Sequence, residues 1–277
     1  MRPKISNRPI LRPGDDGLRN PQAPQALVAA SPSLEAKSFE LQLAFNLFPA
    51  AYVHNSWLSE LQEDGEVLPL EGSAAGAPFR IRRLSAALLR HWHLDRQFDY
   101  DFFDHAKRLA LLDATELVRI GGLAGAILMR DRIRRCVDRA AVTELQRVIG
   151  VDAHQFALSP FAASRDRQCA ELSDVTGDWS KEWPGRSTAA GPDVAAWAAY
   201  SATLIGAAIP RTAPGVLARL LFKFPRSWSA STAPRLSMSP RQRMVLAELL
   251  IDILIAGRSE WRWLFAATES PARHEAS

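Results

Sequence analysis

Cysteine is scarce in this chain, which has only Cys136 and Cys169 among its 277 residues. The two do not form a Cys-x-x-Cys pair, so neither a disulfide framework nor a thiol-rich zinc site is indicated, and a reducing compartment is favoured. Cys136 would fall on the buried side of a helix, where a thiol acts as a small core hydrophobe rather than as a reactive group.

Long apolar runs are also missing. The best candidate, residues 194–209, is uncharged but rich in alanine and stops at Pro210. It falls short of the roughly 20 apolar residues that a bilayer requires. Near the N-terminus, residues 26–30 are too short for the apolar region of a signal peptide. We therefore expect a cytoplasmic protein that does not insert directly into a membrane.

The common catalytic motifs are absent as well. The chain has no GxxxxGK[ST] phosphate loop, no GxSxG elbow and no GxGxxG after a predicted strand. Glu248 and Asp252 share one helical face, but that face lies opposite Leu246 and Leu250 and is typical of the solvated side of an amphipathic helix. We expect no catalytic residue, no cofactor and no metal, and hence a protein that is not an enzyme.

The chain has no large excess of one charge: 34 Lys and Arg stand against 30 Asp and Glu, which gives a formal net charge of +4. The hydrophobic share of 47% is ordinary for a soluble globular protein. So small a basic surplus suits an acidic protein surface at least as well as nucleic acid, and composition does not choose between them.

The chain divides into a folded part and two flanks. Residues 1–38 are rich in proline and arginine without apolar periodicity, which predicts a disordered leader, although a mis-assigned start codon would look the same. Residues 39–265 predict an all-α, single irregular multi-helix domain with a long connector at about 160–191. Residues 266–277 predict a flexible tail.

Helical periodicity with end signals locates the main helices. Apolar residues recur at three-four spacing over 117–128, and Asp113 with Glu116 predicts a capping box before them. We expect another helix over 130–149, with Val137 among its inward-facing residues. Two further helices are expected over 192–209 and 214–224, each of which begins at a proline. A last one is expected to begin at Ser239-Pro240 and to end at Gly257.

Three histidines raise the question of a metal. His91 and His93 are two apart, so they point to different sides of a helix, and His105 is distant in sequence. The i, i+4 spacing of a zinc-binding helix is missing. Structural or surface roles are favoured, and a metal-dependent enzyme that uses the three histidines remains an alternative.

The densest basic run includes Arg130, Arg134 and Arg135. No aromatic residues are interleaved with these arginines, and no nucleic-acid-binding signature accompanies them. A solvated face that contacts an acidic protein is favoured, with a basic helical nucleic-acid-binding regulator as the alternative.

Residues 45–58, here called the aromatic corner, combine four aromatic rings with Pro49, which bends the chain. We expect Phe45 and Phe48 to anchor the bend in the core. Tyr52, His54 and Trp57 follow the proline and carry polar tips, so we expect them to form a contact surface for a partner.

Four blocks, in order along the chain, resemble the SctK/YscK family, the cytosolic sorting-platform adaptors of bacterial type III secretion systems. The blocks are the aromatic corner, Gly122–Val137 with its Ile-Arg-Arg-Cys-Val ending, the arginine–leucine segment Leu217–Pro225, and the closing amphipathic segment Val245–Phe265. The leader and the enlarged loops at 65–78 and 160–191 depart from the family pattern.

The resemblance implies an all-helical, non-enzymatic adaptor at the cytoplasmic face of the inner membrane, held there by protein partners. Its implied partners are the cytoplasmic domain of the inner-membrane ring protein and the pod protein of the sorting platform. Through these contacts it would support the secretion of substrates.

Overall fold

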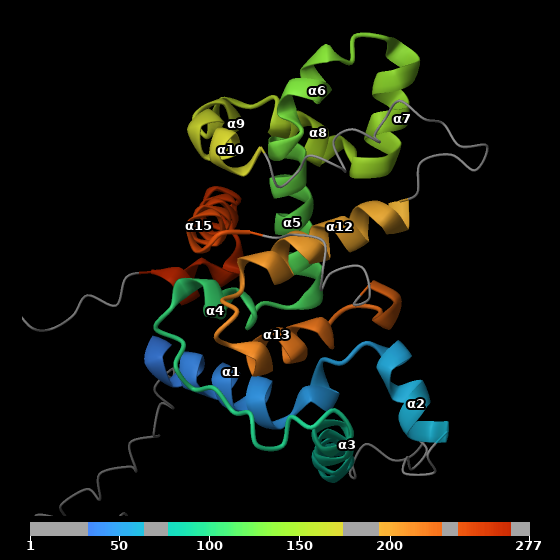
Figure 1. Ribbon diagram of the computed structural model, residues 1–277, viewed down its shortest axis with the longest axis vertical. Helices are drawn as coiled ribbons and strands as arrows, with labels where there is room; N and C mark the ends of the chain where they lie inside the picture. The colour runs from blue at the N-terminus through green and yellow to red at the C-terminus, as the bar shows by residue number, and fades with distance from the viewer. Residues whose placement is uncertain (1–32, 64–76, 174–193, 229–237, 267–277) are drawn as a thin grey trace, which may run out of the picture.

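Every regular element in the described part of the chain is a helix (Figure 1). The computed structural model describes residues 33–63, 77–173, 194–228 and 238–266. Its α-helices are α1 (Leu34–Leu47), α2 (Leu58–Glu63), α3 (Ala77–His91), α4 (His105–Leu109), α5 (Ala114–Leu128), α6 (Arg130–Arg135), α7 (Arg139–Ile149), α8 (Val151–Ala157), α9 (Pro160–Ala163), α10 (Asp166–Leu172), α12 (Val194–Ala208), α13 (Pro214–Leu221) and α15 (Pro240–Ala256). Short 3-10 helices are η1 (Pro49–Ala51), η2 (Asn55–Trp57) and η4 (Glu260–Phe265). The expected all-α class is confirmed.

Side-chain caps decide where several helices begin. Asp113 Oδ1 accepts a hydrogen bond from the backbone N–H of Glu116 at 2.8 Å, and α5 begins where the sequence predicted it. The Glu116 carboxylate pairs with Arg119 at 2.7 Å instead of closing the expected capping box. At the start of α15, Ser239 and Gln242 do form a complete capping box.

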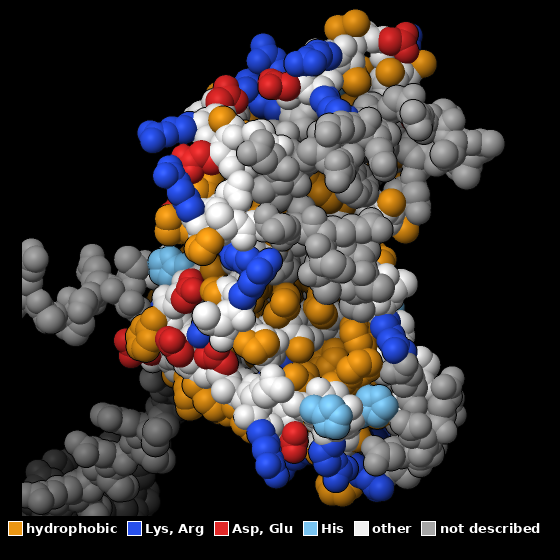
Figure 2. Space-filling view, in the orientation of Figure 1, with side chains coloured by type: hydrophobic (Ala, Val, Ile, Leu, Met, Phe, Trp, Pro, Cys, Tyr) orange, Lys and Arg blue, Asp and Glu red, His pale blue; other side chains and the backbone are white. Residues whose placement is uncertain are grey.

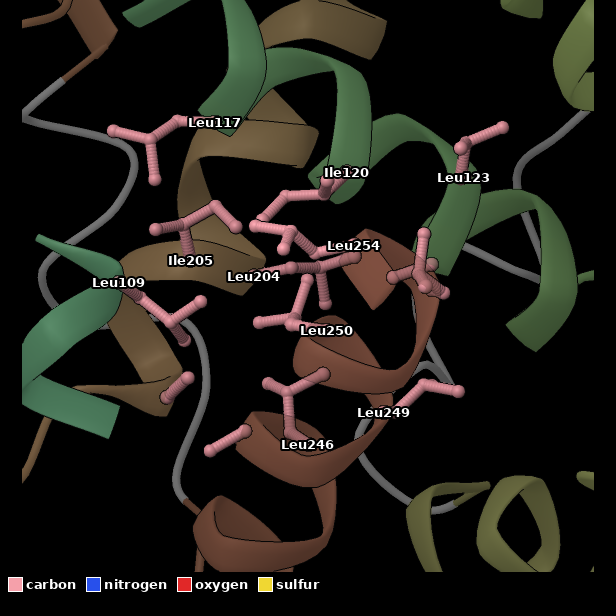
Figure 3. Packing of buried hydrophobic residues seen from close by; sticks show 14 of the residues in the cluster. Leu109, Leu117, Ile120, Leu123, Leu204, Ile205, Leu246, Leu249, Leu250 and Leu254 are labelled. Carbon is pink, nitrogen blue, oxygen red and sulfur yellow. The ribbon is translucent and has the colours of Figure 1, made fainter. Parts of the chain in front are cut away.

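The core lies where α5, α12 and α15 meet. Figure 3 shows Ile120, Leu204, Leu250 and Leu254 meeting between these helices. The other labelled side chains from the three helices are Leu117, Leu123, Ile205, Leu246 and Leu249. Glycine allows the close approach. A Cβ placed on Gly121 of α5 would lie 2.5 Å from the backbone oxygen of Ser201 on α12. Gly121 therefore permits the close packing of α5 on α12.

The molecule is elongated, with α5 near its middle (Figure 1). Helices α6 to α10 gather at one end, whereas α1, α3 and α13 lie toward the other. Within the described ranges, no helix is both long and apolar enough to cross a bilayer.

The helix expected over 130–149 is in fact two helices, α6 and α7. Asp138 Oδ2 accepts a hydrogen bond from the backbone N–H of Ala141 at 2.9 Å and so begins a new helix. Cys136, at the end of α6, is extended. The interruption changes which face is buried, and Val137, expected to face inward, is 89% exposed.

Two expected boundaries also differ. Helix α1 begins at Leu34, inside the range assigned to the leader, because Ser33 Oγ accepts a hydrogen bond from the N–H of Ala36 at 3.2 Å. The connector expected at 160–191 begins with the short helices α9 and α10. Residues 1–32 of the leader, 174–191 of the connector and 267–277 of the tail lie outside the described residues.

Candidate protein-interaction surfaces

The aromatic corner is held mostly inside the protein. Phe45 is buried and stacks on Tyr52, with 5.7 Å between the ring centroids. The Tyr52 hydroxyl donates to the carbonyl of Phe45 at 2.7 Å. Trp57 is 5% exposed, and its Nε1–H donates to the carbonyl of Phe224 at 2.8 Å. Two of the three side chains expected at a contact surface therefore have their polar tips paired within the fold.

His54 is the exposed member of that predicted set. Its backbone N–H donates to the carbonyl of Phe222 at 2.7 Å, which fixes the chain while the ring faces solvent. The Nδ1 atom of the ring lies 2.9 Å from the hydroxyl of Ser56. A partner that contacts the corner from outside meets His54 rather than Trp57.

A buried arginine beside the corner was not predicted from the sequence. Arg219 of α13 is 0% exposed and donates to four backbone carbonyls. The acceptors are Gln97 at 2.7 Å, Leu94 at 2.9 Å, Gly215 at 3.1 Å and Asn46 at 3.3 Å. Since a guanidinium presents five donors in a planar fork, this one side chain joins α1, the loop after α3 and α13.

Lys223 is a second buried cation, one helical turn after Arg219. Its Nζ donates to the carbonyls of Ala110, at 2.7 Å, and of Leu112. The same atom lies 5.5 Å from the ring centroid of Phe45 and 5.1 Å from that of Tyr52. The sequence signal for both cations is their i, i+4 spacing in an otherwise apolar segment, with Arg219 in α13 and Lys223 in the turn that follows it.

Burial lowers the pKa of the Lys223 ammonium to about 7, from its ordinary value of 10.5. At a pH between these two pKa values, Lys223 is protonated in the unfolded chain and has released its proton in the folded protein. The free energy of unfolding therefore rises with pH from about 7 upward, as far as this group is concerned. Below pH 7 both states are protonated, and the cost of burying the charge is constant.

A basic patch lies at the far end of the molecule from the corner. It consists of Arg134 and Arg135 on α6, Arg139 at the start of α7, and Val137 between the two helices, all exposed. Figure 2 shows Lys and Arg side chains gathered over this end. An exposed apolar side chain bordered by arginines suits a partner whose surface is acidic around an apolar contact.

Arg130 was predicted to share a partner-binding surface with Arg134 and Arg135, but its side chain makes a contact within the fold. Its guanidinium pairs with Asp166, and its side chain is 13% exposed. The pair ties the start of α6 to α10. Arg130 thus holds the basic end together, whereas Arg134 and Arg135 face solvent.

The three histidines do not converge. His91 ends α3, His93 follows it with a positive φ of 54°, and His105 begins α4 and sets its ring edge-on to Phe265. Across the parts of the chain that the structure describes, no group of three His, Cys, Asp or Glu side chains is placed to hold a metal ion.

An aromatic groove of about 630 Å³ runs between α1, the loop before α4, and η4. Its exposed rings are Phe39, Tyr100 and Phe103, and Trp263 lines it from η4. Phe103 is 87% exposed. No local sequence pattern predicts this groove, because its walls come from three segments that are distant in sequence.

Comparison with known families places the chain among type III secretion proteins. The matching family model, YOP proteins translocation protein K (YscK), covers residues 40–256. That is more than half of the chain, so the chain belongs to the YscK family, and the resemblance stated from its sequence is confirmed. No curated protein and no solved structure is significantly similar to it.

Proposed function

We propose that the protein is a non-enzymatic, cytoplasmic adaptor of a type III secretion system. In this role it links the cytoplasmic domain of the inner-membrane ring protein to the pod protein of the sorting platform. It reaches the cytoplasmic face of the inner membrane through these partners, and it supports the secretion of substrates as a class rather than of one substrate.

Membership of the YscK family carries the proposal. The basic patch supports it, because exposed arginines around Val137 at one end of an elongated molecule offer a surface for one partner while the other end stays free for a second. Arg134 and Arg135 are the side chains we assign to that contact. An acidic partner surface would steer the encounter and fix its register.

The test is co-purification of the full chain with the two partners, compared with the double charge reversal Arg134→Glu/Arg135→Glu. Both arginines are exposed, so the variant should keep the melting temperature of the parent. It should lose one partner, retain the other, and fail to restore secretion of all substrates in a strain that lacks the gene. Arg82→Glu/Arg83→Glu on α3 is the matched control, since it makes the same change of charge at exposed positions elsewhere.

Failure of the unmodified chain to recover either partner from secreting cells would refute the adaptor role. Loss of the same partner in both charge-reversal variants would assign the effect to net charge rather than to the basic patch. The nucleic-acid alternative predicts binding that falls steeply with salt, because neutralised phosphates release counterions. Binding of duplex or single-stranded nucleic acid at low salt, lost in the Arg134→Glu/Arg135→Glu variant, would favour that alternative instead.

A further inference from the structure

The aromatic groove is an apolar feature that the adaptor role does not use. Leu34 and Phe39 of α1 are each 55% exposed at its edge, and Tyr100 is 45% exposed on the opposite wall. A second hollow of about 500 Å³ adjoins it around the same Trp263. So many exposed rings at one hollow mark a binding site for an apolar or proline-rich segment.

Exposed carboxylates flank the groove. Glu35 lines it, while Asp101 and Asp104 stand next to its ring residues in the loop before α4, and Asp101 lies 3.7 Å from the Lys107 ammonium. The cation in the wall, Arg108, is already engaged: it donates to the carbonyls of Phe102 at 2.7 Å and Leu264 at 2.9 Å. Figure 2 shows acidic side chains beside hydrophobic ones over this flank. The groove therefore suits a peptide segment that combines arginine with apolar residues such as proline.

Residues 1–32 of the same chain have this chemistry. They contain five Arg or Lys against two Asp, and the run Arg19-Asn20-Pro21-Gln22-Ala23-Pro24 carries a P-x-x-P spacing with an arginine two residues before it. Proline-rich segments of this kind dock in aromatic-lined grooves as polyproline II helices, whose order is largely preformed. An arginine in such a segment pairs with a carboxylate at the rim of the groove.

The connection is short enough to favour contact within one molecule. Residues 25–33 separate Pro24 from Leu34, and nine residues span up to about 30 Å when extended. The groove follows α1 from Leu34 to Gln42, which is a rise of about 12 Å. A tether of this length gives an effective concentration of order 1 mM. A segment that binds with a Kd of about 1 mM, or some −4 kcal/mol, would thus occupy the groove for a large share of the time.

The family comparison sets these same parts apart. The match begins at residue 40 and ends at 256, so the proline–arginine run lies outside it, and so do Leu34–Phe39 and Trp263–Ala266 of the groove. Occupant and much of the site thus occur together beyond the range that the family model covers.

From this placement we propose that residues Arg19–Pro24 bind in the aromatic groove of their own chain. The rings of Phe39, Tyr100 and Phe103 pack against the prolines, and Glu35 receives Arg19. The groove is covered in the free protein, and a partner that uses it must displace the segment.

The experiment uses the full chain with p-benzoylphenylalanine in place of Phe103. Irradiation followed by peptide mapping should give cross-links to residues 19–24. Pro21→Ala/Pro24→Ala in the same chain should abolish most of them. Pro9→Ala/Pro13→Ala removes as many prolines from the same flank and should leave the cross-links in place.

Two further arms separate the alternatives. The photoreactive residue at Phe79, which is 69% exposed on α3 and outside the groove, should give few cross-links to residues 19–24. A mixture of heavy and light isotope-labelled chains distinguishes contact within one molecule from contact between copies. Mixed-isotope cross-links, an absence of cross-links to residues 19–24, or an equal yield of these cross-links after Pro21→Ala/Pro24→Ala would each overturn the proposal. The outcome does not depend on the secretion partners, so it stands or falls apart from the adaptor role.

Discussion

Replacing Gly121 by alanine should separate α5 from α12 and destabilise the protein. The new Cβ would lie 2.5 Å from the backbone oxygen and 3.0 Å from the carbonyl carbon of Ser201, and backbone atoms cannot rotate aside. Overpacking of this kind costs roughly 1–3 kcal/mol. Alanine also gains up to about 1 kcal/mol of helix propensity over glycine, which offsets part of that cost.

Gly122→Ala is the matched control. It lies next in the same helix, and its Cβ would meet the Trp197 indole nitrogen at 3.4 Å, an ordinary contact. Because the propensity gain is the same for both variants, Gly121→Ala should be less stable than Gly122→Ala by roughly 1–3 kcal/mol. Thermal unfolding followed by circular dichroism measures the difference as about 2–4 °C for each kcal/mol. Equal melting temperatures would refute the close helix contact.

Two further predictions concern the buried cations. Arg219→Lys should lower stability by roughly 3 kcal/mol or more, because an ammonium cannot reach all the carbonyls that the guanidinium satisfies, and each buried carbonyl left unpaired costs about 1–3 kcal/mol. The midpoint of urea unfolding should fall with an unchanged slope, and an unchanged midpoint would contradict the burial of Arg219. In the parent protein, the free energy of unfolding should rise between about pH 7 and 9, by up to about 1.4 kcal/mol per pH unit. Lys223→Met should flatten this rise, and parallel pH profiles would show that Lys223 does not titrate in that interval.

Local signals located several of the main helices. Helices α5, α12, α13 and α15 lie within a few residues of the expected ranges, because apolar spacing and caps act between neighbours in the chain. The break at Asp138 shows the limit of periodicity. The apolar pattern ran on across it, yet a single carboxylate cap began a new helix and turned Val137 outward.

The interaction residues were harder to infer, because their burial depends on contacts with residues that are distant in the sequence. Trp57 was expected at a surface, but its indole N–H finds a carbonyl 167 residues further along the chain. Arg219 and Lys223 went unnoticed because arginine and lysine are rarely fully buried. Arg134 and Arg135 do face solvent, and whether they contact a partner stays a prediction.

The hydrogen bonds that hold the aromatic corner can form only late in the synthesis of the chain. Trp57 pairs with Phe224, and Arg219 supplies donors for carbonyls as early as Asn46. In each pair the earlier residue leaves the ribosome long before its hydrogen-bond partner has been made. At roughly 5–20 residues per second, the 167 residues between Trp57 and Phe224 take roughly 8–33 s to make. During that interval the N-terminal helices cannot complete their packing, and they remain open to chaperones or to early association with another protein.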